Sequence, residues 1–188
     1  MRSARIHVLT GDGRGKTTSA AGTALRTVGH GGSCLFCQFM KGAMFSGEVA
    51  ALERFAPLVE VRRYGPLCSR GHISPLPRDC GNCRECWLTD STRTRHAQLA
   101  GEGLAHAMKS LRSGGWNLVV LDELCTALHE NLVSGDEVRA GLENAECDEV
   151  IITGRNAPRW LTEMADVVSK VVCVKYNHDS TPRAGIEY

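Results

Sequence analysis

A glycine-rich run near the start of the chain carries the residues best suited to chemistry. Its sequence is Gly11-Asp12-Gly13-Arg14-Gly15-Lys16-Thr17-Thr18. Glycines let backbone N–H groups converge on phosphate oxygens, and a helix that begins here points its positive end at the same place. Lys16 adds a point charge, and the Thr17 hydroxyl can reach a phosphate-bound Mg²⁺. The run predicts a phosphate-binding P-loop; a glycine-rich turn without a ligand is the alternative.

The spacing of this loop is shorter than usual. The general signature has four residues between its first glycine and the Gly-Lys pair. Here only Asp12, Gly13 and Arg14 separate Gly11 from Gly15. We therefore expect a nucleotide to lie differently here than in ordinary NTPases.

A second nucleotide signal is the pair Asp122-Glu123, which directly follows the apolar run 118–121. In a Walker B strand, one carboxylate holds Mg²⁺, directly or through water, and a second lies near the phosphates. Taken alone, the pair is weak evidence for a nucleotide site, because many strands end in acidic residues that start a turn. Together with the upstream P-loop it predicts a Mg²⁺ site formed by Thr17, Asp122 and Glu123.

Buried strands and helices alternate along the chain. Apolar runs typical of strands cover 6–10, 34–39, 59–61, 118–121, 150–153 and 167–174, and helical patterns cover 17–28, 48–55, 89–111, 134–144 and 158–165. This alternation predicts an α/β fold with a doubly wound, mostly parallel sheet. Periodicity is lost between 65 and 88, so we expect one domain over 1–188 with an insert loop there.

Ligands of such sheets bind at the carboxyl ends of the strands. Four of the predicted strands are followed by polar groups at 11–17, 38–41, 122–123 and 154–155. We expect these groups to line one crevice, with Gln38, Lys41 and Arg155 in it. Arg155 could bind phosphate bidentately. The alternatives are a structural ion pair for Arg155 and solvated loop positions for Gln38 and Lys41.

The composition of the chain argues against several other classes of protein. The chain has 188 residues, a formal net charge of +1 and nine cysteines. With no overall basic character, nucleic acid is not the expected partner. No apolar run approaches membrane-spanning length and no signal peptide precedes the first strand, so we expect a cytoplasmic protein. An odd, high cysteine count in that compartment favours metal or redox chemistry over a disulfide framework.

Four of the cysteines lie in the insert: Cys68, Cys80, Cys83 and Cys86. Four thiolates suit either tetrahedral Zn²⁺ or a four-iron cluster. Three cysteines separated by two-residue gaps slightly favour the iron–sulfur cluster, with Cys68 closing the site from upstream. His72 is an alternative ligand, and reduced thiols without a metal are the remaining alternative. The other cysteines are expected in or near the core, at positions 34, 37, 125, 147 and 173.

Five motifs, which follow one another in a fixed order, allow a more specific assignment of the sequence. They lie at 11–18, 38–42, 120–124, 152–158 and 185–188, the last being Gly185-Ile186-Glu187-Tyr188. In these motifs the chain resembles the ATP:corrinoid adenosyltransferases of the P-loop type (the cob(I)yrinic acid a,c-diamide adenosyltransferase family). The resemblance covers most of the chain outside residues 65–88 and includes the short P-loop.

The resemblance implies a homodimeric enzyme of RecA-like P-loop fold. It implies that Mg–ATP is bound and that its 5′-deoxyadenosyl group passes to the Co(I) centre of a corrinoid, a cobalamin or cobyrinic acid a,c-diamide, with release of triphosphate. The cobalt would first be reduced, commonly by a flavoprotein. By matching motif, Lys16, Thr17 and Glu123 would be catalytic. Residues 11–18 with Gln38, Lys41 and Arg155 would bind ATP, in an orientation reversed relative to ordinary NTPases.

One segment departs from the family pattern. Relatives place aromatic residues that press on the corrinoid after the glycine corresponding to Gly65, where this chain has Pro66 and Cys68. Tyr64 or Trp87 could substitute, although each is more often a packed aromatic. The departure favours one alternative, an ATP- or corrinoid-binding sensor on the same scaffold without transferase activity. An ordinary P-loop ATPase or kinase is a separate alternative.

Overall fold

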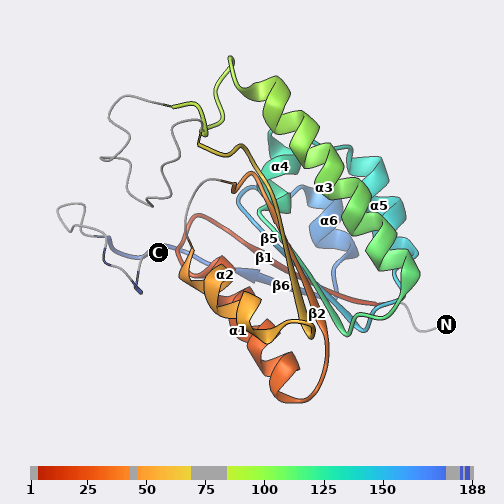
Figure 1. The fold of residues 1–188 in the computed structure, drawn as a ribbon. Helices are drawn as coiled ribbons and strands as arrows, with labels where there is room; N and C mark the ends of the chain where they lie inside the picture. The colour runs from red at the N-terminus through yellow and green to blue at the C-terminus, as the bar shows by residue number, and fades with distance from the viewer. Residues whose placement is uncertain (1–3, 43–45, 69–83, 177–182, 184, 187–188) are drawn as a thin grey trace.

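A single parallel sheet organises the computed structural model, which describes residues 4–42, 46–68, 84–176, 183 and 185–186. Within these ranges the sheet has six strands in the order β3-β2-β4-β5-β1-β6, and every neighbouring pair is parallel (Figure 1). The strands are β1 (Arg5–Thr10), β2 (Cys34–Phe39), β3 (Val59–Tyr64), β4 (Leu118–Asp122), β5 (Glu149–Thr153) and β6 (Val167–Lys170).

Helices cover both faces of the sheet. On one face lie α1 (Lys16–Gly29) and α2 (Gly47–Leu52), the latter continued by a 3₁₀ turn, Glu53–Phe55. The other face carries α3 (Arg93–Ser113), α4 (Leu124–His129), α5 (Gly135–Glu143) and α6 (Arg159–Met164). The predicted α/β, doubly wound, parallel sheet is therefore confirmed.

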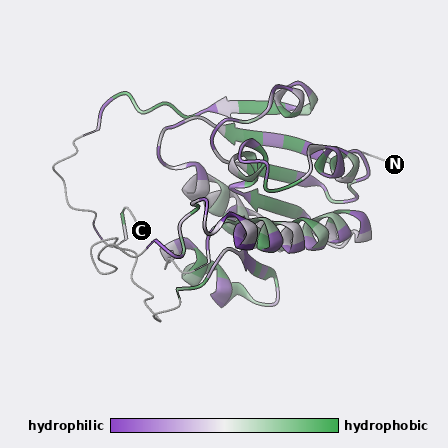
Figure 2. Cartoon of the chain, turned by 90° about the horizontal axis from the view of Figure 1, so that it is seen from above, coloured by the Kyte–Doolittle hydropathy of each residue, from purple (hydrophilic) through white to green (hydrophobic). Residues whose placement is uncertain are grey.

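Each central strand supplies apolar side chains to both layers, because successive residues point to opposite faces. In β2, Leu35, Cys37 and Phe39 pack toward the α3 side, whereas Cys34 and Phe36 pack toward α1. The strands are accordingly hydrophobic along most of their length, whereas hydrophilic and hydrophobic residues alternate along the helices (Figure 2). No helix among the described residues is long and apolar enough to cross a membrane.

Several element boundaries differ from the predicted ones. Strand β3 continues to Tyr64 because it pairs with β2 along its whole length, and its charged residues are tolerated on an edge strand. Strand β6 ends at Lys170, opposite the last residue of β1, so the predicted strand over 167–174 is too long. Helix α3 begins at Arg93, after a turn in which the Thr92 hydroxyl accepts from the Thr89 N–H at 2.9 Å. The short helix α4 was not predicted.

The described cysteines outside the insert are placed as expected, with one exception. Cys34, Cys37, Cys125 and Cys147 are buried, and burial raises the pKa of the first three thiols to about 12. Cys173 is exposed, so its predicted core position is wrong. It lies beyond the end of β6, where the sheet no longer covers it.

The start of α5 offers a test of local stability. The Ser134 hydroxyl accepts a hydrogen bond from the Glu137 N–H at 3.3 Å and so caps the first turn of the helix. We expect Ser134→Ala to lower the free energy of unfolding by about 1 kcal/mol, because one helix N–H loses its partner. Urea denaturation measures this, with Ser134→Asp as the control that keeps a capping oxygen. Equal losses in the two variants would contradict the cap.

Candidate active site

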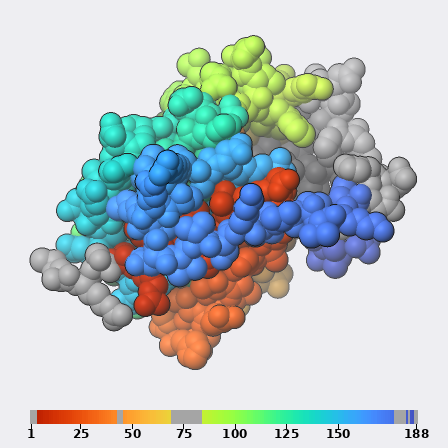
Figure 3. Space-filling model, turned by 180° about the vertical axis from the view of Figure 1, so that it is seen from behind, coloured from red at the N-terminus to blue at the C-terminus, as the bar shows by residue number. Residues whose placement is uncertain are grey.

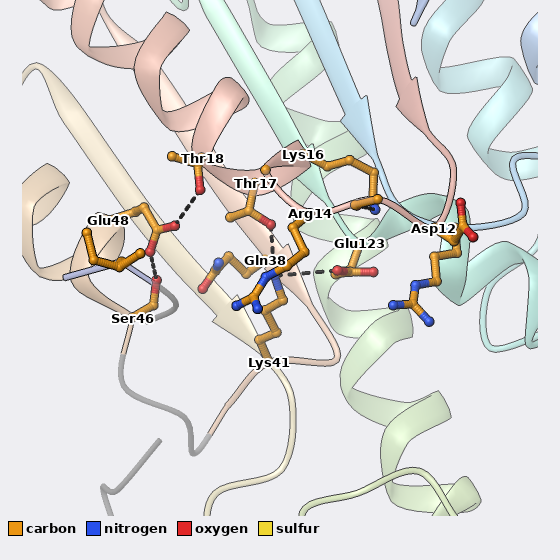
Figure 4. A pocket seen from close by; sticks show the side chains of 14 residues that line it. Asp12, Arg14, Lys16, Thr17, Thr18, Gln38, Lys41, Ser46, Glu48 and Glu123 are labelled. Atoms are coloured by element: carbon orange, nitrogen blue, oxygen red, sulfur yellow. Dashed lines mark hydrogen bonds and ion pairs between the residues drawn. The ribbon is translucent and has the colours of Figure 1, made fainter. Parts of the chain in front are cut away.

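The carboxyl ends of β1, β2, β4 and β5 surround one cavity of about 560 Å³ (Figure 4). All four predicted groups contribute to it. Its lining consists of Asp12, Gly13, Arg14, Gly15, Lys16, Thr17, Thr18, Gln38, Lys41, Ser46, Glu48, Glu123, Arg155 and Ile186. Two other predicted residues, Gly11 and Asp122, lie behind this lining and support it.

The P-loop is braced from the side of β6. The Gly13 N–H donates to the Val171 carbonyl at 2.9 Å, and a Cβ on Gly11 would collide with the same carbonyl. Gly11 and Gly15 have φ angles of 101° and 98°, a region that favours glycine. Strand β6 forms the edge of the sheet next to β1 (Figure 3), so the segment that follows β6 is positioned to hold the loop.

This packing predicts the effect of adding one methyl group to the loop. Gly11→Ala must move the loop away from Val171 and strain its backbone by about 1–3 kcal/mol. We therefore expect weaker ATP binding, measured by titration calorimetry. Gly22→Ala is the matched control, because Gly22 lies in α1 with open space around its Cβ position. Unchanged ATP affinity in Gly11→Ala would contradict the role of the close approach.

Lys16 points back into the loop. Its Nζ donates to the Gly13 carbonyl at 2.6 Å, and the side chain is buried. Burial lowers the pKa of Lys16, Arg155 and Lys41 lower it further, and Glu123 and Asp12 oppose them. Among the residues that the structure describes, one carbonyl holds the ammonium inside the loop, and a phosphate oxygen would be a stronger acceptor.

Asp122 is the centre of the polar network. Its carboxylate is completely buried and accepts four hydrogen bonds. Oδ1 accepts from Thr17 Oγ1 at 2.9 Å and from Thr153 Oγ1 at 2.7 Å. Oδ2 accepts from Gln38 Nε2 at 3.0 Å and from Lys41 Nζ at 2.9 Å. Burial alone would raise the pKa of Asp122, but the Lys41 charge and these hydrogen bonds outweigh it, so the pKa is lowered.

Glu123 lies beside this network in a left-handed backbone conformation, with φ of 63°. The Thr126 hydroxyl donates to its Oε2 at 2.7 Å, and Lys41 Nζ lies 3.5 Å from its Oε1. The Glu123 N–H donates to Thr153 Oγ1 at 3.0 Å. Thr153 therefore connects the two acidic residues, and Thr126 fixes the orientation of the second.

A third carboxylate lines the cavity from α2. Glu48 accepts from the Thr18 hydroxyl at 3.1 Å through Oε1 and from the Ser46 hydroxyl at 2.7 Å through Oε2 (Figure 4). Burial would raise the pKa of Glu48, but hydrogen bonds from Ser46, its own backbone and Thr18 lower it overall. This cluster places another negative group on the wall beside the P-loop, away from Glu123.

Sequence reasoning missed Glu48, Ser46, Thr126 and Thr153. Thr153 is the last residue of a predicted strand. A hydroxyl at the carboxyl end of a strand is a signal from which Thr153 could have been identified. Glu48 stands at the start of the helix predicted over 48–55, but nothing in that pattern indicates that this helix reaches the P-loop.

The alternatives for the crevice residues can be judged from their contacts. Gln38 is buried and Lys41 contacts two carboxylates, so neither is a solvated loop residue. Within the described ranges, the Arg155 guanidinium forms no ion pair, so the structural pairing considered for it is not observed. Arg14 is exposed, and its Nη1 donates to the Tyr176 hydroxyl at 3.3 Å.

The donor set beside the P-loop fits a magnesium ion. Thr17, Asp122 and Glu123 offer hydroxyl and carboxylate oxygens, which Mg²⁺ prefers, and Mg²⁺ commonly retains several waters. Gln38 Oε1 is buried and has no hydrogen-bond partner in the described part of the chain. Because Gln38 Nε2 already donates to Asp122, this oxygen remains an acceptor for a donor such as a metal-bound water.

Comparison with known proteins agrees with this arrangement. The family model described as ATP:corrinoid adenosyltransferase BtuR/CobO/CobP matches residues 2–188. The chain belongs to this adenosyltransferase family. A corrinoid adenosyltransferase of Escherichia coli K12 is 34% identical over 186 residues, which is 97% of this chain and 85% of that protein. The corrinoid adenosyltransferase CobA of Salmonella typhimurium LT2 is 33% identical over 188 residues, covering 97% and 85%.

A more distant adenosyltransferase, from Sinorhizobium sp, is 30% identical over 187 residues, covering 97% of this chain and 79% of that protein. The family match also runs across the insert, which the sequence motifs alone did not cover.

The insert of this adenosyltransferase is only partly described. Cys68 and Cys86 are half-buried, whereas Cys80, Cys83 and His72 lie outside the described residues. Among the residues that are described, no group of three or more His, Cys, Asp or Glu side chains is arranged to hold a metal.

The two candidate aromatic substitutes differ in their surroundings. Tyr64 packs beside Phe39, with ring centroids 6.4 Å apart, and its hydroxyl lies 2.6 Å from His106 Nδ1. The indole of Trp87 is half exposed. The Tyr64 ring is therefore already packed against Phe39, whereas the Trp87 ring remains accessible to solvent.

Proposed function

We propose that this cavity holds ATP with its triphosphate on the short P-loop and with the ribose C5′ facing the crevice. Co(I) of a bound corrinoid attacks C5′ with its electron pair, so a Co–C bond forms while the C5′–O5′ bond breaks. The bonding pair leaves with O5′ on triphosphate, and the cobalt becomes formally Co(III). The reaction needs no nucleophile or general base from the protein.

The observation that carries this proposal is the convergence of cations and acidic ligands on the short P-loop. Lys16, Arg14, Arg155 and Lys41 all line the cavity with the loop amides. A leaving triphosphate develops charge on O5′, and preorganised cations and N–H groups stabilise that charge in the transition state. We assign Lys16 to the leaving group, and Arg14, Thr18 and Arg155 to binding of the nucleotide.

Thr17, Asp122 and Glu123 would hold Mg²⁺. When bound, the ion would neutralise triphosphate charge. Thr153 and Thr126 act through the acidic pair, because their hydroxyls donate to Asp122 and Glu123 and fix the orientation of the two carboxylates. We treat them as positioning residues.

The family assignment favours the transferase over the sensor and the ordinary ATPase. On the corrinoid side we place Trp87, because its indole is half exposed while Tyr64 is packed against Phe39. A Trp87→Ala variant should bind corrinoid more weakly while its ATP affinity is unchanged.

For the insert we propose a metal held by Cys68, Cys80, Cys83 and Cys86, with a four-iron cluster favoured over Zn²⁺. The support is the ligand spacing in the sequence. A cluster near the corrinoid could pass an electron to Co(II), whereas Zn²⁺ would only stabilise the loop. Metal analysis and the visible spectrum of anaerobically purified protein decide between them. One zinc per chain without cluster absorbance would exclude the cluster.

Three further proposals rest on the family resemblance and composition. We infer a homodimer, a flavoprotein or other electron donor, and a cytoplasmic location in which the thiols stay reduced. Sedimentation of the full chain tests the first, and transfer with a reduced flavoprotein as the only electron source tests the second.

The function itself is tested by identifying both products. The full chain is incubated anaerobically with Mg²⁺, ATP and a chemically reduced corrinoid. We expect one triphosphate for each Co–C bond formed. Release of ADP would indicate the ATPase or kinase alternative, and binding without either product would indicate the sensor.

A further inference from the structure

The ammonium of Lys41 occupies the place where the predicted metal ligands converge. Its Nζ lies 3.1 Å from Thr17 Oγ1 and 3.5 Å from Glu123 Oε1 (Figure 4). The same atom lies 2.9 Å from Asp122 Oδ2. These are the three side chains whose oxygens the P-loop chemistry assigns to Mg²⁺. One cation of the chain itself is thus bound by the whole predicted donor set.

The direction of the hydrogen bonds in this cluster supports that interpretation. The Thr17 hydroxyl donates its hydrogen to Asp122 Oδ1, so the lone pairs of its oxygen face the Lys41 ammonium. A metal ion would use the same lone pairs. Because both cations require the same oxygens, they cannot occupy the cluster together.

The Lys41 side chain can move while its backbone stays in place. The Met40 N–H donates to the Tyr64 carbonyl at 2.8 Å, and the Gly42 carbonyl accepts from the Arg63 guanidinium. These contacts anchor the loop after β2 to the end of β3. The lysine stem has several rotatable bonds and lines the cavity, so its ammonium can swing toward an anionic ligand there.

We propose that Lys41 is a tethered cation that fills the metal position of the nucleotide-free enzyme and is displaced when a divalent cation enters with the nucleotide. This inference rests on the proposed function. In the free enzyme, Lys41 balances the two carboxylates and weakens binding of a metal ion on its own. When the metal–nucleotide complex binds, the ammonium moves to the triphosphate, which provides it with new acceptors. Lys41 thereby couples metal binding to nucleotide binding.

Direct binding of Mn²⁺ to the nucleotide-free protein, followed by electron paramagnetic resonance, tests the proposal. A competitor that leaves the site open one-tenth of the time weakens apparent affinity about tenfold. We expect Lys41→Gln and Lys41→Met to bind Mn²⁺ about tenfold more tightly than the unsubstituted chain. Unchanged Mn²⁺ affinity, with only a loss of stability, would mean that Lys41 is purely structural and would overturn the proposal.

A charge control separates displacement from simple electrostatics. Arg155 lines the same cavity without contacting the three donor side chains in any described interaction. Arg155→Gln removes the same charge, and we expect its effect on Mn²⁺ affinity to be much smaller. Equal effects of Lys41→Gln and Arg155→Gln would show that only charge matters and would also overturn the proposal.

A measurement on the unsubstituted chain covers the case in which the Lys41 variants do not fold. The Lys41 ammonium resonance is followed by ¹H–¹⁵N NMR before and after addition of Mg²⁺ with ATP. We expect it to shift when the two are added together, and an unchanged resonance despite nucleotide binding would contradict displacement. Failure of ATP to bind at all would instead refute the proposed function. The Mn²⁺ comparison is independent of that outcome, because it requires no nucleotide.

Discussion

Lys16→Met should reduce adenosyl transfer by about 100- to 1,000-fold, the loss typical of removing one group that stabilises a developing negative charge. The Lys16 ammonium is buried in the P-loop, and its only described hydrogen bond is to the Gly13 carbonyl. It is therefore free to turn to the leaving triphosphate at little cost. The rate of Co–C bond formation at saturating ATP and corrinoid measures the effect.

The control for this variant is Lys109→Met, which makes the same change on the exposed surface of α3. It should leave the transfer rate unaltered. Lys16→Arg should recover only part of the rate, because a planar, forked guanidinium does not reproduce the compact point charge of an ammonium. A Lys16→Met enzyme within a few-fold of the unsubstituted rate would contradict the assignment of Lys16 to the leaving group.

Asp122→Ala should lower the free energy of unfolding by about 3–5 kcal/mol, as expected when one partner of a buried ion pair is removed. The carboxylate is fully buried and is the acceptor for Thr17, Thr153, Gln38 and Lys41 together. Because Lys41 remains partly exposed, we expect the lower half of that range. Urea denaturation followed by circular dichroism measures the loss.

The same residue predicts a dependence of stability on pH. The folded-state pKa of Asp122 is lowered from 3.8: burial opposes ionisation, but Lys41 and the hydrogen bonds outweigh it. A lowered pKa stabilises the fold fully above the unfolded-state pKa, and this contribution is lost as the pH falls through the folded-state pKa. The stability difference between the unsubstituted chain and Asp122→Asn should thus be constant near neutrality and shrink below about pH 4. A difference that grows in acid would contradict the ionised state of Asp122.

The parts of the fold that could be predicted from sequence are those with strong local patterns. The run Leu118–Leu121 is apolar throughout because β4 is covered on both faces, and the Ser134 cap depends only on residues of its own helix. The P-loop could be located because the glycines and Lys16 are adjacent in sequence. The crevice followed from the rule that parallel strands place their carboxyl ends at one edge.

The parts that could not be predicted depend on contacts between distant segments. The bracing of Gly13 by Val171 requires knowing that β6 lies next to β1, and Glu48 reaches the P-loop only because α2 packs beside α1. The end of β6 is set by the end of β1, so an apolar pattern alone extended the strand and placed Cys173 wrongly in the core. The contact of Lys41 with all three predicted metal ligands likewise depends on three different strand ends.

The most direct test of the central claim is to find which bond of ATP breaks. ATP carrying ¹⁸O at the 5′ bridging position is converted by the full chain with reduced corrinoid under anaerobic conditions, and the products are separated by mass. Attack at the ribose C5′ predicts that the label leaves with triphosphate and that none remains on the adenosyl group. Label recovered in ADP, or retained on the nucleoside, would show cleavage at phosphorus and contradict the transfer of an adenosyl group to cobalt.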